Sequence, residues 1–153
     1  AAIALAELAI GLPAEHPRRS EVEAALVRLL GGCLRCQDAL GMWHQEMADP
    51  EAWVETSGTG LILFALGVAI ERGLMPGTEA RAALELGLRG MLRYIAFNGS
   101  VHHTCMGCLS PGKGTPAEYL AKRHAVDDPH SFGPPVLAFT QAAQCGITHI
   151  SVE

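Results

Sequence analysis

Side chains suited to ligand binding gather first between Trp43 and Ser57. The segment opens with Trp43-His44-Gln45 and closes with Glu55-Thr56-Ser57, directly before an apolar stretch. An indole can stack on the apolar face of a sugar, while imidazole, amide and hydroxyl groups can bond to sugar hydroxyls. This combination favours a carbohydrate-binding loop. A second interpretation of Trp43 stays open, because an indole that follows the turn at Gly41 can equally anchor the loop in the core.

A second polar segment, Asp127-Asp128-Pro129-His130-Ser131, precedes the last apolar stretch of the chain. A helix cap by Asp128 or Ser131, with proline near the helix start, would explain part of this segment. It would not explain the imidazole of His130 between them. We therefore expect His130 or Ser131 to bind a ligand, with simple capping as the alternative.

The five cysteines include two Cys-x-x-Cys pairs, Cys33 with Cys36 and Cys105 with Cys108. Two such pairs can form a Cys₄ zinc site, but structural zinc sites normally place them on turns. Cys33 instead continues an apolar stripe, and its pair is predicted to lie within a helix. We therefore expect free thiols, no metal and no cofactor, and the odd number of cysteines favours a reducing, cytoplasmic setting.

Composition and motifs exclude several classes of function. The net charge is −5, and no cluster of Lys or Arg is longer than the pair Arg18–Arg19, which argues against a nucleic-acid or anionic-membrane surface. The longest apolar run, Leu61 to Ile70, is too short to span a bilayer. The sequence contains no glycine-rich phosphate loop, no H-E-x-x-H and no G-x-S-x-G. Nucleophilic hydrolases of the known motif classes are therefore excluded.

Apolar periodicity predicts five principal helices of two alternating kinds. Three are apolar on all faces, over Ala1–Leu12, Ser57–Arg72 and Ser131–Cys145. Two are amphipathic, over Glu21–Asp38 and Thr78–Ile95. A helix that is apolar all round must be covered on every side, whereas an amphipathic helix lies at the surface. The alternation therefore predicts an all-α chain with an inner and an outer layer of helices.

The connections between these helices also repeat. Gly41 and Gly99 each follow an amphipathic helix, and His44 and His102 stand three residues after them, at an offset of 58 residues. The later connection carries an insertion over Thr104–Asp128. This pattern predicts a repeat of helical hairpins.

Two helix starts carry capping signals. Ser20 and Glu23 predict a capping box ahead of the helix over Glu21–Asp38, and Thr115-Pro116, with Glu118 behind them, predicts the start of a short helix in the insertion. Asn98-Gly99-Ser100 is a formal glycosylation sequon, but the Asn-Gly pair is first of all a tight-turn signal.

In combination, these motifs resemble glycoside hydrolase family 105, whose members are unsaturated rhamnogalacturonyl hydrolases related to the family 88 unsaturated glucuronyl hydrolases. The likeness is carried by the stretches Gly41–Gln45, Asp49–Gly58, Ala69–Gly73, Cys105–Gly107, Tyr119–Leu120 and Asp128–Pro134, in this order. The family fold is an (α/α)₆ toroid of about twice this length. The resemblance implies that residues 1–153 form the C-terminal portion of one such toroid domain, whose N-terminal half is absent from this chain.

The resemblance implies hydration of the C4=C5 double bond in a terminal unsaturated uronyl residue of a pectin-derived oligosaccharide. An aspartic acid protonates C4 and activates water for attack at C5, and the resulting hemiketal opens and releases the next sugar. The reaction needs neither metal nor cofactor. Because the family's acid/base aspartate lies in the N-terminal half, we expect no catalytic residue in this chain, and we expect the chain alone to be inactive.

Five residues of this chain are implied to bind substrate. Trp43 and His44 would line the mouth of the pocket, and Ser57, His130 and Ser131 would lie at the N-terminal ends of inner helices. Free backbone N–H groups and the helix dipole favour a carboxylate there. The expected partners are the oligosaccharide and the N-terminal half of the same protein, with an oligomer as a further expectation and with neither nucleic acid nor membrane.

Two alternatives remain open at this stage. A sugar-epimerase-like toroid enzyme would use several imidazoles at the tips of inner helices, and His44, His102 and His130 partly imitate such a set. A non-catalytic fragment could instead act as a scaffold or bind sugars. An unsaturated disaccharide separates these functions, since only the hydrolase abolishes the absorbance of the conjugated double bond.

Overall fold

The computed structural model describes residues 1–107 and 112–151, and its elements are mainly helical. In chain order these elements are α1 (Ala2–Gly11), α2 (Arg19–Leu34), α3 (Thr56–Glu71), α4 (Thr78–Leu92), β1 (Thr104–Cys105), α5 (Pro116–Leu120), β2 (His124–Ala125) and α6 (Gly133–Gln144). The two strands, each of two residues, form one antiparallel ladder. The prediction of a helical fold class is confirmed.

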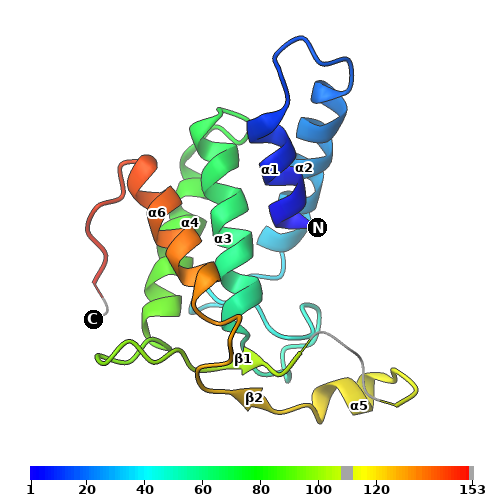
Figure 1. Cartoon of the computed structure of the whole chain (residues 1–153), viewed down its shortest axis with the longest axis vertical. Helices are drawn as coiled ribbons and strands as arrows, with labels where there is room; N and C mark the ends of the chain where they lie inside the picture. Colours follow the sequence, from blue (N-terminus) through cyan, green and yellow to red (C-terminus); the bar gives the residue numbers. More distant parts are fainter. Residues whose placement is uncertain (108–111, 152–153) are drawn as a thin grey trace.

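The helices form two layers around α3. Helices α1 and α6 flank α3, and all three run in the same direction, with their N-terminal ends towards the long loops, the strands and α5 (Figure 1). Helix α2 packs against α1 and α3, and α4 packs against α3 and α6. The chain therefore consists of α-hairpins, α2 with α3 and α4 with α6, as the repeat predicts.

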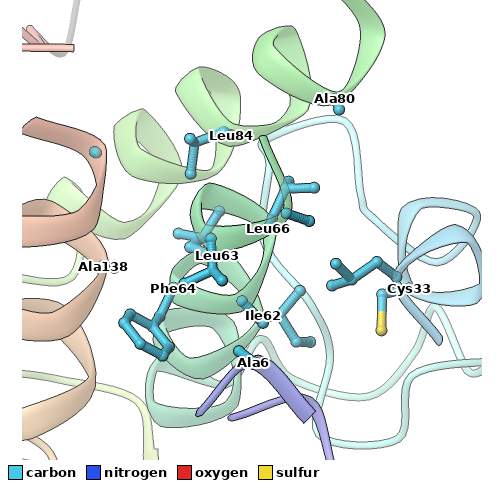
Figure 2. Packing of buried hydrophobic residues seen from close by; sticks show 14 of the residues in the cluster. Ala6, Cys33, Ile62, Leu63, Phe64, Leu66, Ala80, Leu84 and Ala138 are labelled. Atoms are coloured by element: carbon cyan, nitrogen blue, oxygen red, sulfur yellow. The ribbon is translucent and has the colours of Figure 1, made fainter. Parts of the chain in front are cut away.

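The core is centred on α3, which is buried on all faces. Its side chains Ile62, Leu63, Phe64 and Leu66 lie among residues from each of the other principal helices (Figure 2). Helix α4 instead buries one stripe, Leu84, Leu88 and Met91. The distinction between inner and outer helices that periodicity predicts is confirmed for α3 and α4.

Periodicity alone predicts complete burial of α1 and α6, whereas the open edges of a partial toroid would expose the flanks of inner helices such as the one over residues 1–12. Helix α1 buries Ala6 and Ala9, but Leu8 and Ile10 are each 47% exposed. On α6, Val136 is 64% exposed. An apolar flank is covered only where another element lies against it, and α1 and α6 stand at the two ends of the row of inner helices (Figure 1).

The boundaries of α2 correct two predictions. The helix begins at Arg19, and its N-cap residue Arg18 makes no side-chain capping bond, so the predicted box at Ser20 is wrong. Glu23 instead pairs with Arg19, with 2.8 Å between Oε1 and Nε. The helix ends at Leu34 and not at Asp38, so only Cys33 of the first Cys-x-x-Cys pair is helical.

The start of α6 also differs from its prediction. The helix begins at Gly133, two residues after Ser131, and Pro134 and Pro135 occupy its first turn. The first N–H groups of a helix have no intrahelical acceptor, so prolines are tolerated there. Pro134 also lies very close to α3: a Cβ atom added at Gly60 would lie 2.6 Å from the carbonyl carbon of Pro134.

The turns and the insertion follow their predictions. Gly41 and Gly99 both have positive φ, at 90° and 89°. In the insertion, α5 begins after Thr115 as predicted, and the Thr115 hydroxyl and the Glu118 carboxylate form a capping box there. The ladder between β1 and β2 pairs Cys105 with His124 and brings the two ends of the insertion together.

Candidate functional site

The carboxylate of Glu55 lies at the centre of the loop end of the molecule. Glu55 caps α3 by accepting hydrogen bonds from the backbone N–H of Ser57, at 3.0 Å, and from that of Gly58. It also accepts the Ser57 hydroxyl at 2.7 Å and the backbone N–H of Cys105 at 3.1 Å. A buried protein carboxylate thus occupies the N-terminal end of α3, where the sequence predicts that a substrate carboxylate binds.

The expectation that Ser57 contacts the substrate is therefore corrected. Its residue is only 7% exposed, and both its N–H and its hydroxyl bond to Glu55. The sequence did contain a signal for this arrangement, because the helix dipole and the free N–H groups of the first turn favour an acidic side chain at a helix N-terminus.

A second polar group joins β1 to the loop before α6. The Cys105 Sγ lies 3.6 Å from His130 Nε2, and His130 Nδ1 lies 2.5 Å from Asp128 Oδ1. The His130 side chain is 40% exposed, and that of Asp128 is 21% exposed. His130 is thus accessible, as a ligand-binding residue must be. The contact between Cys105 and His130 could not be predicted from local sequence patterns, because these residues are 25 positions apart.

Ser131 and the start of α6 offer little to an anion. Ser131 is completely buried, and its hydroxyl has no hydrogen-bond partner among the described residues. Pro134 and Pro135 have no backbone N–H, so Gly133 and Val136 are the residues of the first turn of α6 that have one. The N–H of Val136 already donates to the Phe132 carbonyl. The expectation that the Ser131 side chain meets substrate is therefore corrected.

Trp43 anchors its loop in the core. Its side chain is 1% exposed, and Nε1 donates a hydrogen bond of 2.7 Å to the Cys33 carbonyl. Its backbone N–H donates to Thr59 Oγ1 at 3.1 Å. The indole has no open face on which a sugar could stack, so the structure corrects its placement at the mouth and supports the alternative of a loop anchor.

His44 is held more openly than Trp43. Its Nδ1 lies 2.5 Å from the Ala52 carbonyl, which therefore accepts a hydrogen bond, and its Nε2 lies 3.4 Å from Asp38 Oδ2. The side chain is 15% exposed. These bonds fix the ring plane, and an imidazole fixed in this way can bond to one ligand atom at a defined position.

A small cavity of about 160 Å³ lies between this loop and α3. Its lining includes His44, Gln45, Glu55 and Thr59. Both polar atoms of the Gln45 amide are buried without a hydrogen-bond partner among the described residues. Because a buried amide is stable only when it is bonded, the cavity is suited to water or to a hydroxyl-bearing group.

Two stacked imidazoles, His103 and His124, also lie at the loop end of the molecule. The rings of His103 and His124 stack with 4.0 Å between centroids; Trp53 contacts both rings edge-on, and Tyr94 lies tilted against His103. Burial lowers the pKa of His103, and repulsion from His124 lowers it further. His103 also has a positive φ of 58°. The neutral form of His103 is therefore favoured in the stack.

The described cysteines do not form a zinc site with one another. Across residues 1–107 and 112–151, no three histidine, cysteine, aspartate or glutamate side chains are grouped as metal ligands. Cys108, half of the second Cys-x-x-Cys pair, lies outside the described residues. Burial raises the pKa of the Cys33 thiol and of the Cys145 thiol.

A sequence model of the family described as Glycosyl Hydrolase Family 88 matches residues 1–145. The chain belongs to glycosyl hydrolase family 88. This family processes carbohydrates, so the family assignment agrees with the resemblance that the motifs carry. Within the part of the family 88 chain that the structure describes, every helix is too short or too polar to cross a lipid bilayer.

Known proteins show the same relationship. A 24.9 kDa protein of the picA locus of Rhizobium radiobacter is 27% identical over 158 residues, which cover 92% of the family 88 chain and 67% of the relative. A possible member of family GH105 from Salmonella enterica serovar Paratyphi A matches the structure with a TM-score of 0.83 at 20% identity. That match covers 95% of this chain and 38% of the Salmonella chain.

A third match is to a protein named as a polysaccharide lyase, with a TM-score of 0.77 and 19% identity over 98% of this chain and 42% of the other. The family 88 chain thus spans less than half the length of these solved structures. It has the fold of part of an (α/α)₆ toroid.

Proposed function

We propose that this chain forms part of the substrate-binding end of a toroidal glycoside hydrolase that acts on unsaturated uronyl residues of pectin-derived oligosaccharides. The match of the family 88 model to residues 1–145 carries this proposal. It is supported by the common direction of α1, α3 and α6, which brings their N-terminal ends and both long loops to one end of the molecule (Figure 1).

The residues proposed to meet the substrate either are exposed at this end or line its small cavity. His130 presents its imidazole to solvent, and His44 and Gln45 line the small cavity beside α3. Trp43, Ser57 and Ser131 support these side chains from the core. Imidazole and amide groups can bond to sugar hydroxyls and to a uronate carboxylate, so these residues orient the substrate.

The acid/base step is proposed to use an aspartate from the rest of the toroid. That group protonates C4 of the unsaturated ring and then takes a proton from the water that adds at C5. The hemiketal formed at C5 opens and releases the next sugar. Without this proton donor, we expect a loss of about 10²–10⁴-fold in rate, and without the opposite wall a further large loss.

The test follows the absorbance of the conjugated double bond in an unsaturated rhamnogalacturonyl or glucuronyl disaccharide. We expect no change with the 153-residue chain alone and a decrease when the chain is joined to the remaining toroid segments. In the joined protein, His130→Ala should slow the decrease, while His16→Ala, at an exposed position on the α1–α2 loop, should not. A joined, folded protein that leaves the absorbance unchanged would refute the hydrolase proposal.

The fold likeness to a polysaccharide lyase favours a second candidate, which the same assay separates. A lyase forms the conjugated bond when it cleaves a uronate polymer. On uncut polymer, it would therefore raise the absorbance that the proposed hydrolase removes. An epimerase or a binding fragment would do neither.

A further inference from the structure

The side chains of Cys105, His130 and Asp128 contact one another in series at the loop end of the molecule. The sulfur of Cys105 lies 3.6 Å from Nε2 of His130, and the other ring nitrogen lies 2.5 Å from the Asp128 carboxylate. The two nitrogens of one imidazole thus face a sulfur and a carboxylate. The proposed sugar chemistry makes no use of the sulfur.

Each member of this group has a definite physical role. The Asp128 carboxylate accepts a hydrogen bond from the protonated Nδ1. The unprotonated Nε2 therefore faces the sulfur and can act as a base. An imidazole in this position can take the proton of the thiol and leave a thiolate beside an imidazolium. The Glu55 carboxylate fixes the Cys105 backbone through its bond to the N–H, and therefore holds the sulfur in place.

Two other cysteines of the described chain, Cys33 and Cys145, lie in the opposite environment. Burial raises the pKa of Cys33 and that of Cys145, and the Cys145 Sγ donates to the Gly67 carbonyl at 3.3 Å. These two sulfurs stay protonated near neutral pH. Cys105 is partly exposed, and the His130 ring beside it is 40% exposed, so a small solute reaches this group.

We infer that Cys105 is a modification site whose sulfur is oxidised by a small hydroperoxide, with His130 and Asp128 as its activating pair. The thiolate sulfur attacks one oxygen of hydrogen peroxide, a sulfur–oxygen bond forms and the oxygen–oxygen bond breaks. The leaving hydroxide takes the proton from the His130 imidazolium and departs as water. Sulfur is oxidised to sulfenic acid, and the peroxide is reduced.

The experiment treats the full 153-residue chain with hydrogen peroxide and dimedone, which traps sulfenic acid, and follows each tryptic peptide by mass spectrometry. A Cys108→Ser background leaves Cys105 as the one cysteine of peptide 94–113, and Cys145 is the one cysteine of peptide 124–153. Cys145 is thus an internal control in every sample. The readout is the mass of the peptide and does not depend on sugar turnover.

We expect Cys105 to be modified at least about tenfold faster than Cys145. His130→Phe, which keeps a ring of similar size, should bring the Cys105 rate close to that of Cys145, while His16→Phe should leave it unchanged. Asp128→Asn provides a second variant with little loss of volume, and we expect an intermediate rate. Equal rates at Cys105 and Cys145, or a Cys105 rate that neither the His130 nor the Asp128 variant lowers, would overturn the inference.

Discussion

Glu55 Oε1 accepts a hydrogen bond of 3.1 Å from the backbone N–H of Cys105, a residue 50 positions further along the chain. The same carboxylate caps α3 through Ser57 and Gly58. One buried side chain therefore joins the first long loop, the start of the central helix and the insertion. His44 lies on the first of these segments, and Cys105, which contacts His130, lies on the last.

Removal of the Glu55 carboxylate should destabilise the whole chain. Glu55→Ala loses the cap of α3 and leaves the N–H groups of Ser57 and Cys105 without their acceptor, at a cost of about 2–4 kcal/mol. Glu55→Gln keeps one acceptor oxygen and should cost less. The free energy of unfolding in urea measures both. Exposed Glu51 is the matched control, and Glu51→Ala should change it by less than about 0.5 kcal/mol.

Trp43 and His44 are neighbours in the chain, but their substitution should have different consequences. Trp43→Ala leaves a cavity in the core and removes the indole hydrogen bond to the Cys33 carbonyl, which should cost about 3–5 kcal/mol of stability. His44→Ala loses one hydrogen bond to the Ala52 carbonyl and should cost about 1 kcal/mol. Urea unfolding of both variants decides this. A Trp43→Ala chain as stable as His44→Ala would contradict the anchoring role of the indole.

The close packing of α3 on α6 depends on Gly60. A Cβ atom at this position would lie 2.6 Å from the backbone of Pro134, so Gly60→Ala should force the helices apart and cost about 1–3 kcal/mol. Gly31 lies within α2, where an added Cβ meets nothing within 4 Å. Gly31→Ala should therefore stabilise the chain by about 0.5–1 kcal/mol. Thermal unfolding of the two variants should shift in opposite directions.

Local patterns predicted the types of helix correctly, but not how completely they are covered. Periodicity reports which faces of α3 and α4 are apolar, and both predictions are confirmed. Periodicity cannot report whether a neighbour lies against a face; the exposure of Leu8 on α1 instead agrees with the expectation that a partial toroid exposes the flanks of its inner helices at open edges, and Val136 on α6 is exposed in the same way. At Ser20, the start of α2 was misplaced because the ion pair of Arg19 with Glu23 replaces the expected cap.

The candidate site was predictable in place but not in its contacts. The two loops that carry His44 and His130 do lie at the same end, because α3 and α6 run in the same direction. The bonds from Glu55 to Cys105 and from Cys105 to His130 join distant parts of the chain, and no local spacing encodes them. Trp43 had two interpretations, and only its burial distinguishes them.

The stacked imidazoles make the stability of the chain depend on pH. Burial and the neighbouring His124 lower the pKa of His103 in the folded state, so the unfolded chain binds this proton more readily. The resulting stability is present above the unfolded pKa of about 6.5 and is lost as the pH falls below it towards the lowered folded value.

His103→Asn cannot take up this proton, and asparagine tolerates the positive φ of this position. The difference in unfolding free energy between about pH 7.5 and about pH 5.5 should therefore be smaller in His103→Asn than in the parent chain, while the exposed control His16→Asn should leave it unchanged. An undiminished difference in His103→Asn would assign the acid sensitivity to other groups.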